Sequence, residues 1–138
     1  HPAGSLGAKL KTVEDIMLTG KKIPFVNENL KMKSALKILT NKKLGTLIVQ
    51  NNKKQTKGII TDGQIRRFSE KNSDLLSFKV GHIMTKNPIS IDKNALAAKA
   101  LSLMNFRKIT SLCVFDKKNK LKTIGVIHIH NILQSNIS

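Results

Sequence analysis

Hydrophobic positions follow the same order twice along the chain. Each half begins with an apolar turn that ends in methionine, at residues 13–17 and again at 80–84. Each half later has an apolar segment that opens with glycine, at Gly58 and again at Gly125. The copies lie about 65–67 residues apart, so nearly the whole chain is two copies of one supersecondary unit. Such a unit cannot bury its apolar face alone, and we expect the two to face each other across a ligand-binding cleft.

The spacing of apolar residues predicts the order β-α-β-β-α in each half. Helical spacing of i, i+3, i+4 and i+7 occurs within residues 32–39 and 96–104. Asn27 or Asn29 is expected to cap the first of these helices. In the first half, the predicted strands are residues 24–26, 46–49 and 58–61, and the closing helix runs from 62 to about 70. In the second half, the predicted strands are residues 88–91, 111–115 and 123–127, and residues 131–134 lie in the closing helix.

The predicted fold class is α/β, with two β-α-β-β-α repeats packed about a pseudo-twofold axis. Residues 1–12 do not match the repeat and are expected to be a connector from an upstream domain. Residues 13–74 are the predicted first repeat, and residues 75–138 the second. Neither half is large enough to be very stable alone. Because the chain does not begin with methionine, we expect a fragment or a processed product.

The chain is strongly basic, with 25 Lys and Arg against 8 Asp and Glu and a formal net charge of +17. Clustered basic residues bind nucleic acid by releasing counterions from phosphate, so a basic nucleic-acid-binding domain is one alternative. Here the lysines are spread along the chain, the arginines are Arg66, Arg67 and Arg107, and the sequence has no Trp or Tyr for base stacking. We therefore favour a solvated basic surface that draws anionic small molecules to a cleft.

The sequence also predicts a cytoplasmic location. No apolar run approaches the ~20 residues of a membrane span, and the start lacks the basic and apolar regions of a signal peptide. The single cysteine, Cys113, excludes an internal disulfide and suits a reducing compartment. Since it lies in an apolar strand, we expect it in the core.

The best binding signature is the strand-to-helix junction of the first half, residues 58–64. The strand ends, Thr61 presents a hydroxyl group, and a helix begins whose free backbone N–H groups favour an anion. Gln64, three positions later, can accept a hydrogen bond from a ribose hydroxyl, and two arginines follow within one turn. The alternative is that Thr61 or Asp62 only caps the helix and that the arginines are surface charges.

The second half repeats this junction over residues 125–131, with histidines at 128 and 130. On a strand, residues two apart share a face, so His128 and His130 could both contact one ligand. A metal site needs further ligands, and no Cys or carboxylate lies close in sequence, so no metal is expected. We expect His128 to line the cleft and His130 to cap the final helix.

These junctions resemble the CBS domain family, whose members occur as tandem pairs. The resemblance covers about residues 12–136 and implies binding of adenine nucleotides or related ligands through a Gly-x-x-Thr/Ser-x-x-Asp pattern. Gln64 stands where this pattern has the acid, and His128 where it has the hydroxyl. The matching positions are Gly58, Thr61 and Gln64 in the first half, and Gly125, His128 and Asn131 in the second.

A closer resemblance is to the bacterial arabinose 5-phosphate isomerases, a family that joins a sugar isomerase domain to a CBS pair. Residues 61–67 are similar to its Thr-Asp-Gly-Asp-Leu-Arg-Arg segment, residues 83–88 and 128–133 to its second CBS copy, and residues 1–7 to the run that closes its isomerase domain. The resemblance implies the C-terminal regulatory pair of an enzyme that interconverts ribulose 5-phosphate and arabinose 5-phosphate for Kdo and lipopolysaccharide synthesis. His1 matches a family isomerase-domain histidine whose partners lie upstream, so no catalytic residue is expected in this fragment.

The predicted function is therefore regulatory and ligand-sensing. The expected ligand is an anionic small molecule, such as an adenine or cytidine nucleotide, and no other cofactor is expected. Expected partners are the chain's own upstream isomerase domain and a second copy in a homodimer; a ligand-free oligomerisation module is the main alternative. The predicted ligand contacts are Lys43, Thr61, Asp62, Gln64, Arg67, Lys108, Thr110, His128, His130 and Asn131.

Overall fold

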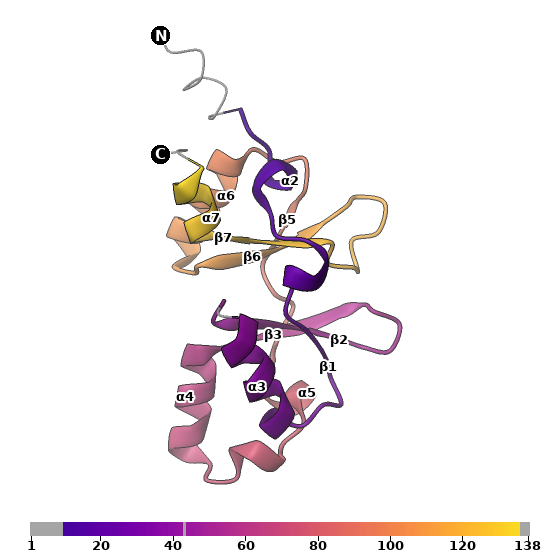
Figure 1. Cartoon of the computed structure of the whole chain (residues 1–138), viewed down its shortest axis with the longest axis vertical. Coiled ribbons are helices and arrows are strands. Elements are labelled where there is room, and N and C mark those ends of the chain that lie inside the picture. The colour runs from indigo at the N-terminus through magenta and orange to yellow at the C-terminus, as the bar shows by residue number, and fades with distance from the viewer. Residues whose placement is uncertain (1–9, 43, 136–138) are drawn as a thin grey trace. The chain divides into compact units, whose positions relative to one another are not determined.

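The computed structural model of the chain describes residues 10–42 and 44–135. They divide into two compact units, each an α/β arrangement with a sheet and helices (Figure 1). The central unit runs from Lys21 to Pro88. The terminal unit combines the described residues up to Gly20 with those from Ile89 onward. The predicted α/β fold class is thereby confirmed.

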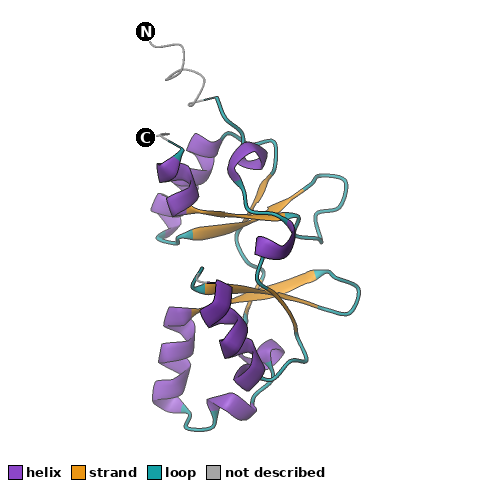
Figure 2. Cartoon of the chain, in the orientation of Figure 1, coloured by secondary structure: helices purple, strands orange, loops and turns teal. Residues whose placement is uncertain are grey.

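The central unit contains a mixed sheet of order β1-β2-β3-β4. Strand β1 pairs parallel to β2, while β2 with β3 and β3 with β4 pair antiparallel. Figure 2 shows its α-helices gathered on one face of the sheet. Its elements are η1 (Gly20–Lys22, which begins at the unit boundary), β1 (Phe25–Asn27), α3 (Met32–Lys42), β2 (Thr46–Gln50), β3 (Thr56–Thr61), α4 (Asp62–Lys71), η2 (Leu75–Ser77), α5 (Val80–Ile83) and β4 (Thr85–Lys86).

The terminal unit repeats this plan with a sheet of order β5-β6-β7. Strand β5 pairs parallel to β6, and β6 pairs antiparallel to β7. Its elements are α2 (Val13–Ile16), β5 (Ser90–Asp92), α6 (Ala97–Arg107), β6 (Ser111–Phe115), β7 (Gly125–His128) and α7 (Ile129–Gln134). Each parallel pair is bridged by one helix, α3 or α6, which covers the sheet and completes a βαβ unit.

Each unit has its own hydrophobic core between sheet and helices. Most positions of the predicted stripes are buried: Met32 and Ala35 on α3 are fully inaccessible, as are Ala100 and Met104 on α6. Leu96, predicted to begin the second stripe, is 44% exposed, because it is the N-cap that precedes α6 and not part of its buried face. Cys113 is also buried, as the sequence predicts. The described buried cores are Val26, Met32, Ala35, Leu39, Leu47, Val49, Ile60, Leu75, Val80 and Ile83 in the central unit, and Val13, Ile91, Ala97, Ala100, Met104, Leu112, Val114, Ile127 and Ile132 in the terminal unit.

The compact units do not coincide with the sequence repeats, because the methionine turns are exchanged. Helix α2 opens the first repeat but belongs to the terminal unit, where Leu18 and Val126 exchange backbone hydrogen bonds of 2.8 and 3.0 Å. Helix α5 opens the second repeat but belongs to the central unit, where β4 pairs with β3. Each sheet is therefore completed by a turn from the other repeat.

Glycine is required where each exchanged turn lies against a hairpin. A Cβ atom on Gly58 would stand 2.6 Å from the Thr85 carbonyl oxygen and 2.8 Å from the Met84 sulfur. A Cβ atom on Gly125 would overlap the Met17 side chain in the same way. The two glycines that mark the repeat thus allow close approach of a methionine turn from elsewhere in the sequence.

The predicted cap of the first long helix is wrong. Helix α3 begins at Met32, five residues after Asn27. The Asn27 side chain instead accepts a 2.8 Å hydrogen bond from the Asn29 N–H and donates to Asn52. The asparagine side chain commonly accepts a hydrogen bond from the backbone N–H two residues later. Here this local turn uses the Asn27 oxygen, so Asn27 does not cap α3.

Gly58→Ala is expected to lower the free energy of unfolding by about 1–3 kcal/mol, because its methyl group would collide with backbone of the exchanged turn. Urea denaturation of the chain measures this change. Gly63→Ala on α4 is the matched control: its Cβ meets only the flexible end of Arg67, and helix propensity favours alanine by up to about 1 kcal/mol. If Gly58→Ala were as stable as Gly63→Ala, the close approach would be contradicted.

Candidate functional site

The first junction, between β3 and α4, is organised by Thr61. Thr61 is the N-cap of α4, and its hydroxyl oxygen accepts a 3.2 Å hydrogen bond from the Gln64 N–H. The next N–H, on Asp62, donates to the Gly45 carbonyl at 3.1 Å. Thr61 therefore caps α4, which was one of the two roles that the sequence left open for it. A hydroxyl group accepts and donates at once, so capping leaves the Thr61 proton for a ligand.

Gln64 ties this junction to the exchanged methionine turn. Its amide nitrogen donates to the Ile83 carbonyl at the end of α5. An aspartate, which the resemblance leads one to expect here, has no such donor when ionised. The amide oxygen of Gln64 keeps its acceptor capacity, so a ribose contact remains chemically open.

Charges of both signs lie on the first turn of α4. Asp62 is exposed, and its carboxylate faces Gly45: an added Cβ there would be 3.0 Å from the carboxylate oxygen. The guanidinium of Arg67 folds back toward the same turn, with Nη1 3.2 Å from where a Cβ on Gly63 would stand. An anion at this junction therefore gains from Arg67 and is repelled by Asp62. Lys43, also predicted to contact the ligand, lies outside the described residues.

The second junction, between β7 and α7, carries a stacked histidine pair. The Nδ1 atom of His128 accepts a 3.1 Å hydrogen bond from the His130 N–H, and the two rings stack with centroids 4.8 Å apart. The side-chain oxygen of Asn131 in turn accepts a 2.9 Å hydrogen bond from the His128 N–H. These bonds form a capping box in which a histidine takes the place of Ser or Thr.

The predicted cap of the final helix is therefore wrong, since His128 and not His130 is the N-cap. The two histidines do not share a strand either, because β7 ends at His128 and His130 is already helical. Burial lowers the pKa of His128, and the neighbouring charge on His130 lowers that pKa further. The neutral imidazole is the form that can accept at Nδ1.

A backbone hydrogen bond joins the loop after α6 to this junction. Helix α6 ends at Arg107, followed by Lys108 in the left-handed conformation (φ 56°), and both side chains are exposed. The Thr110 carbonyl accepts a 2.8 Å hydrogen bond from Ile129, which fixes the loop after α6 to the start of α7. Thr110 therefore lies beside the start of α7, while ligand contacts of Thr110 and Lys108 stay predictions.

A polar residue that the sequence pattern did not single out lies at the start of each hairpin. Thr46 is buried and pairs with Thr61 in the β2–β3 register; Ser111 pairs with His128 in the β6–β7 register. The Ser111 hydroxyl oxygen is buried and has no hydrogen-bond partner within the described part of the chain. A hydroxyl residue that opens an otherwise apolar strand in both repeats was the available signal.

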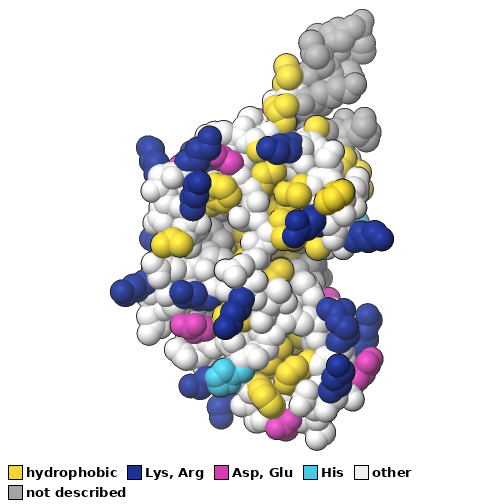
Figure 3. All heavy atoms as spheres, turned by 180° about the vertical axis from the view of Figure 1, so that it is seen from behind, with side chains coloured by type: hydrophobic (Ala, Val, Ile, Leu, Met, Phe, Trp, Pro, Cys, Tyr) yellow, Lys and Arg dark blue, Asp and Glu magenta, His cyan; other side chains and the backbone are white. Residues whose placement is uncertain are grey.

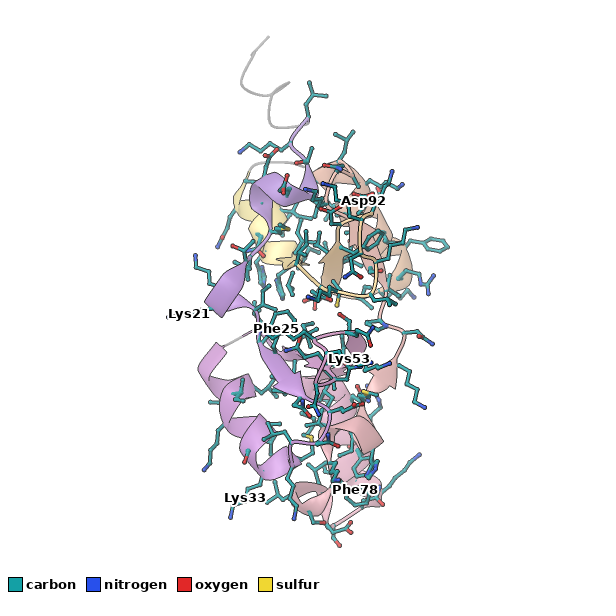
Figure 4. The ribbon with its side chains drawn as sticks, turned by 90° about the vertical axis from the view of Figure 1, so that its right-hand side faces the viewer. Lys21, Phe25, Lys33, Lys53, Phe78 and Asp92 are labelled. Atoms are coloured by element: carbon teal, nitrogen blue, oxygen red, sulfur yellow. The ribbon has the colours of Figure 1, made fainter. Side chains whose placement is uncertain are left out.

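The ion pairs of the terminal unit lie at the other end of its strands. Lys93 pairs with Glu14 and Asp116 at 3.4 Å each, and Lys117 pairs with Asp92 at 3.5 Å. Figure 4 labels Asp92 in this region. Asp116 follows β6 at the end opposite Ser111 and His128. The acidic groups that pair with lysine are thereby kept away from the histidine junction.

Basic side chains elsewhere are distributed rather than gathered. Figure 3 shows Lys and Arg spread over the face in view, with fewer acidic groups among them. Lys33 on α3 and Lys53 in the β2–β3 hairpin are both exposed (Figure 4). Among the described residues, no three His, Cys, Asp or Glu side chains are placed to hold a metal ion. None of the described helices has the length and apolar character needed to cross a membrane.

Known relatives include curated bacterial enzymes. The arabinose 5-phosphate isomerase KdsD of Yersinia pestis is 39% identical over 138 residues, which is 99% of this chain and 41% of the relative. KdsD of Escherichia coli strain K12 is 37% identical with the same coverage. The chain thus spans about two fifths of the length of the curated relatives it matches.

Solved structures share the fold. CBSX2 in complex with AMP matches with a TM-score of 0.78 at 23% identity, over 92% of this chain and 96% of that one. The CBS domain pair of protein MJ0100, in complex with 5'-methylthioadenosine and S-adenosyl-L-methionine, matches with a TM-score of 0.78 at 20% identity, over 91% and 94%. The family model described as "CBS domain" matches twice, at residues 13–71 and 80–137. Two matches that fill most of the chain, together with this fold, show that it belongs to the CBS domain family as a tandem pair.

Proposed function

We propose that this chain is the regulatory, ligand-sensing CBS pair of an arabinose 5-phosphate isomerase. The observation that carries this proposal is similarity along the whole chain to isomerases that are more than twice its length. The remaining part of such an enzyme would carry the interconversion of ribulose 5-phosphate and arabinose 5-phosphate. A ligand on the pair would regulate that reaction only if it binds the arrangements of the pair unequally. A cytoplasmic location stays a prediction from the sequence.

The proposed ligand is an anionic small molecule of the adenine or cytidine nucleotide class. Two structural relatives were solved with AMP or with adenosine-containing sulfur compounds, which supports this class. In the central unit, Thr61 would donate its hydroxyl proton to a phosphate, Arg67 would supply charge, and the Gln64 amide oxygen would accept from a ribose hydroxyl. The net charge of +17 would raise the local concentration of any such anion.

The second junction offers a different set of contacts. The Nε2–H of neutral His128 and the side chains of Lys108 and Thr110 are proposed donors, and His130 and Asn131 complete the set. Asp62 and Lys43 stay predicted contacts of the first junction. Binding in a cleft shared by the repeats also stays a prediction from the sequence.

A ligand-free oligomerisation module is the second candidate. Two observations favour it: the Gln64 amide nitrogen and the capping atoms of His128 and Asn131 are already used within the fold. Large apolar side chains are also exposed on the last two helices, with Phe106 81% and Leu133 49% accessible. Isolated exposed apolar residues are common, but an aromatic ring this exposed suits an interface. Nucleic-acid binding has only the net charge in its favour.

Calorimetry against AMP, ATP and cytidine-activated Kdo should detect binding of at least one of them. A ligand at 100 times its dissociation constant should also add about 2.7 kcal/mol to the free energy of unfolding. Arg67→Gln is expected to weaken binding roughly tenfold to a hundredfold, as loss of a charged hydrogen bond does. Lys33→Gln, which removes an exposed charge from α3, is the matched control and should bind like the wild type.

The outcomes separate the candidates. No heat and no stabilisation with any of these anions would leave the oligomerisation module as the function. Retention on DNA that survives ~200 mM salt would favour nucleic-acid binding, because nonspecific phosphate attraction is lost by then.

The chain is expected to be a dimer in solution, and Phe106→Glu is expected to convert it to a monomer, because a charge would replace an exposed ring on α6. Light scattering after size-exclusion chromatography measures the mass. Leu121→Glu, at another exposed apolar position (60% accessible) in the β6–β7 hairpin, is the control and should stay dimeric. A monomeric wild type, or a dimeric Phe106→Glu variant, would contradict this assignment.

A further inference from the structure

The hydrogen bond that caps α7 depends on the protonation state of one histidine. The Nδ1 atom of His128 accepts from the His130 N–H at 3.1 Å, so Nδ1 carries no proton and the neutral ring is protonated at Nε2. In the imidazolium form both ring nitrogens are donors, and this bond cannot form. The matching cap in the central unit, Thr61 on α4, uses a hydroxyl group that does not titrate in this range.

We propose that the stacked His128–His130 pair is an acid-sensitive latch that holds the first turn of α7. Protonation of His128 removes the side-chain cap and places two imidazole rings with centroids 4.8 Å apart under mutual repulsion when both are charged. Helix α7 has six residues, and a helix this short depends on its cap and on its buried anchor, Ile132. Acid therefore loosens the helix that closes the terminal unit. The latch does not depend on whether a ligand binds.

The surroundings of His128 favour the neutral ring. From β6 it pairs with the uncharged Ser111, and the loop that the Thr110 carbonyl joins to the start of α7 carries the cationic Lys108. The acidic residues of α2, which packs on β7, are engaged elsewhere: Glu14 with Lys93 and Asp15 with the N–H of Thr12. Burial, and then the charge on His130, lower the pKa of His128 below the ordinary 6.5.

The direction of the pH effect follows from this lowered pKa. The unfolded chain binds a proton at His128 near pH 6.5, while the folded chain resists it to lower pH. The stability from this group is therefore complete above about pH 6.5 and is lost as the pH falls through the folded-state pKa.

The test is an NMR titration of the chain from pH 8 to pH 5. The ring nitrogens of His128 report its protonation, and the amide of His130 reports the capping bond. The two should change together, with a midpoint below 6.5, and amide exchange in α7 corrected for intrinsic rates should accelerate about fivefold, as loss of a typical cap implies. A His130 amide that does not move while His128 titrates would overturn the latch.

Variants provide an independent readout. His128→Thr supplies a cap that does not titrate, as Thr61 does in the central unit, and should abolish the acid-induced acceleration in α7. His130→Gln keeps the backbone donor and removes the second ring, so the midpoint of His128 should rise. His82→Asn, on exposed α5 surface, is the matched control and should leave both readouts unchanged. If His128→Thr kept the full acid response, the latch would be wrong.

Discussion

Contact between each methionine turn and the hairpin glycine of the other repeat is the constraint on which the structure depends. Gly58 and Gly125 leave space for Met84 and Met17, and without a Cβ the exchanged turns can bond to the sheet edges. Each sheet is thereby finished by residues from the other half of the sequence. Each core therefore includes residues of both repeats: Val13 lies in the core of the terminal unit, and Val80 and Ile83 lie in the core of the central unit.

The exchange also shapes the candidate sites. In the central unit, Gln64 reaches from the start of α4 to the exchanged turn, which couples the strand-to-helix junction to the second repeat. In the terminal unit, Asn131 at the matching position turns back onto its own helix and completes a capping box with His128. The two junctions thus have similar backbones but differ in which polar side-chain groups remain able to contact a ligand. We infer that the repeats have diverged in chemistry more than in fold.

Much of the fold could be predicted from the sequence, because the spacing of apolar residues indicates which side chains are buried. The stripe through Met32, Ala35 and Leu39 and the apolar run of β6 are patterns that only one arrangement buries. The exchange of turns could not be predicted. A sequence repeat indicates that a methionine turn packs on a hairpin, but not whether the turn comes from the same repeat or from the other one. The histidine cap was missed because residues two apart read equally as one strand face or as a strand end followed by a helix. Thr46 and Ser111 were not singled out, because each is the first residue of a strand that is otherwise mostly apolar.

We propose above all that these strand-to-helix junctions bind an anionic nucleotide. Amide chemical-shift mapping with AMP tests it most directly, because it reports each residue separately. We expect saturable shifts at residues 61–64 and 128–131, with small changes in the ion-paired loops around Asp92 and Asp116. Shifts confined to exposed lysines and abolished by moderate salt, or no shifts at saturating AMP and cytidine nucleotide, would contradict it.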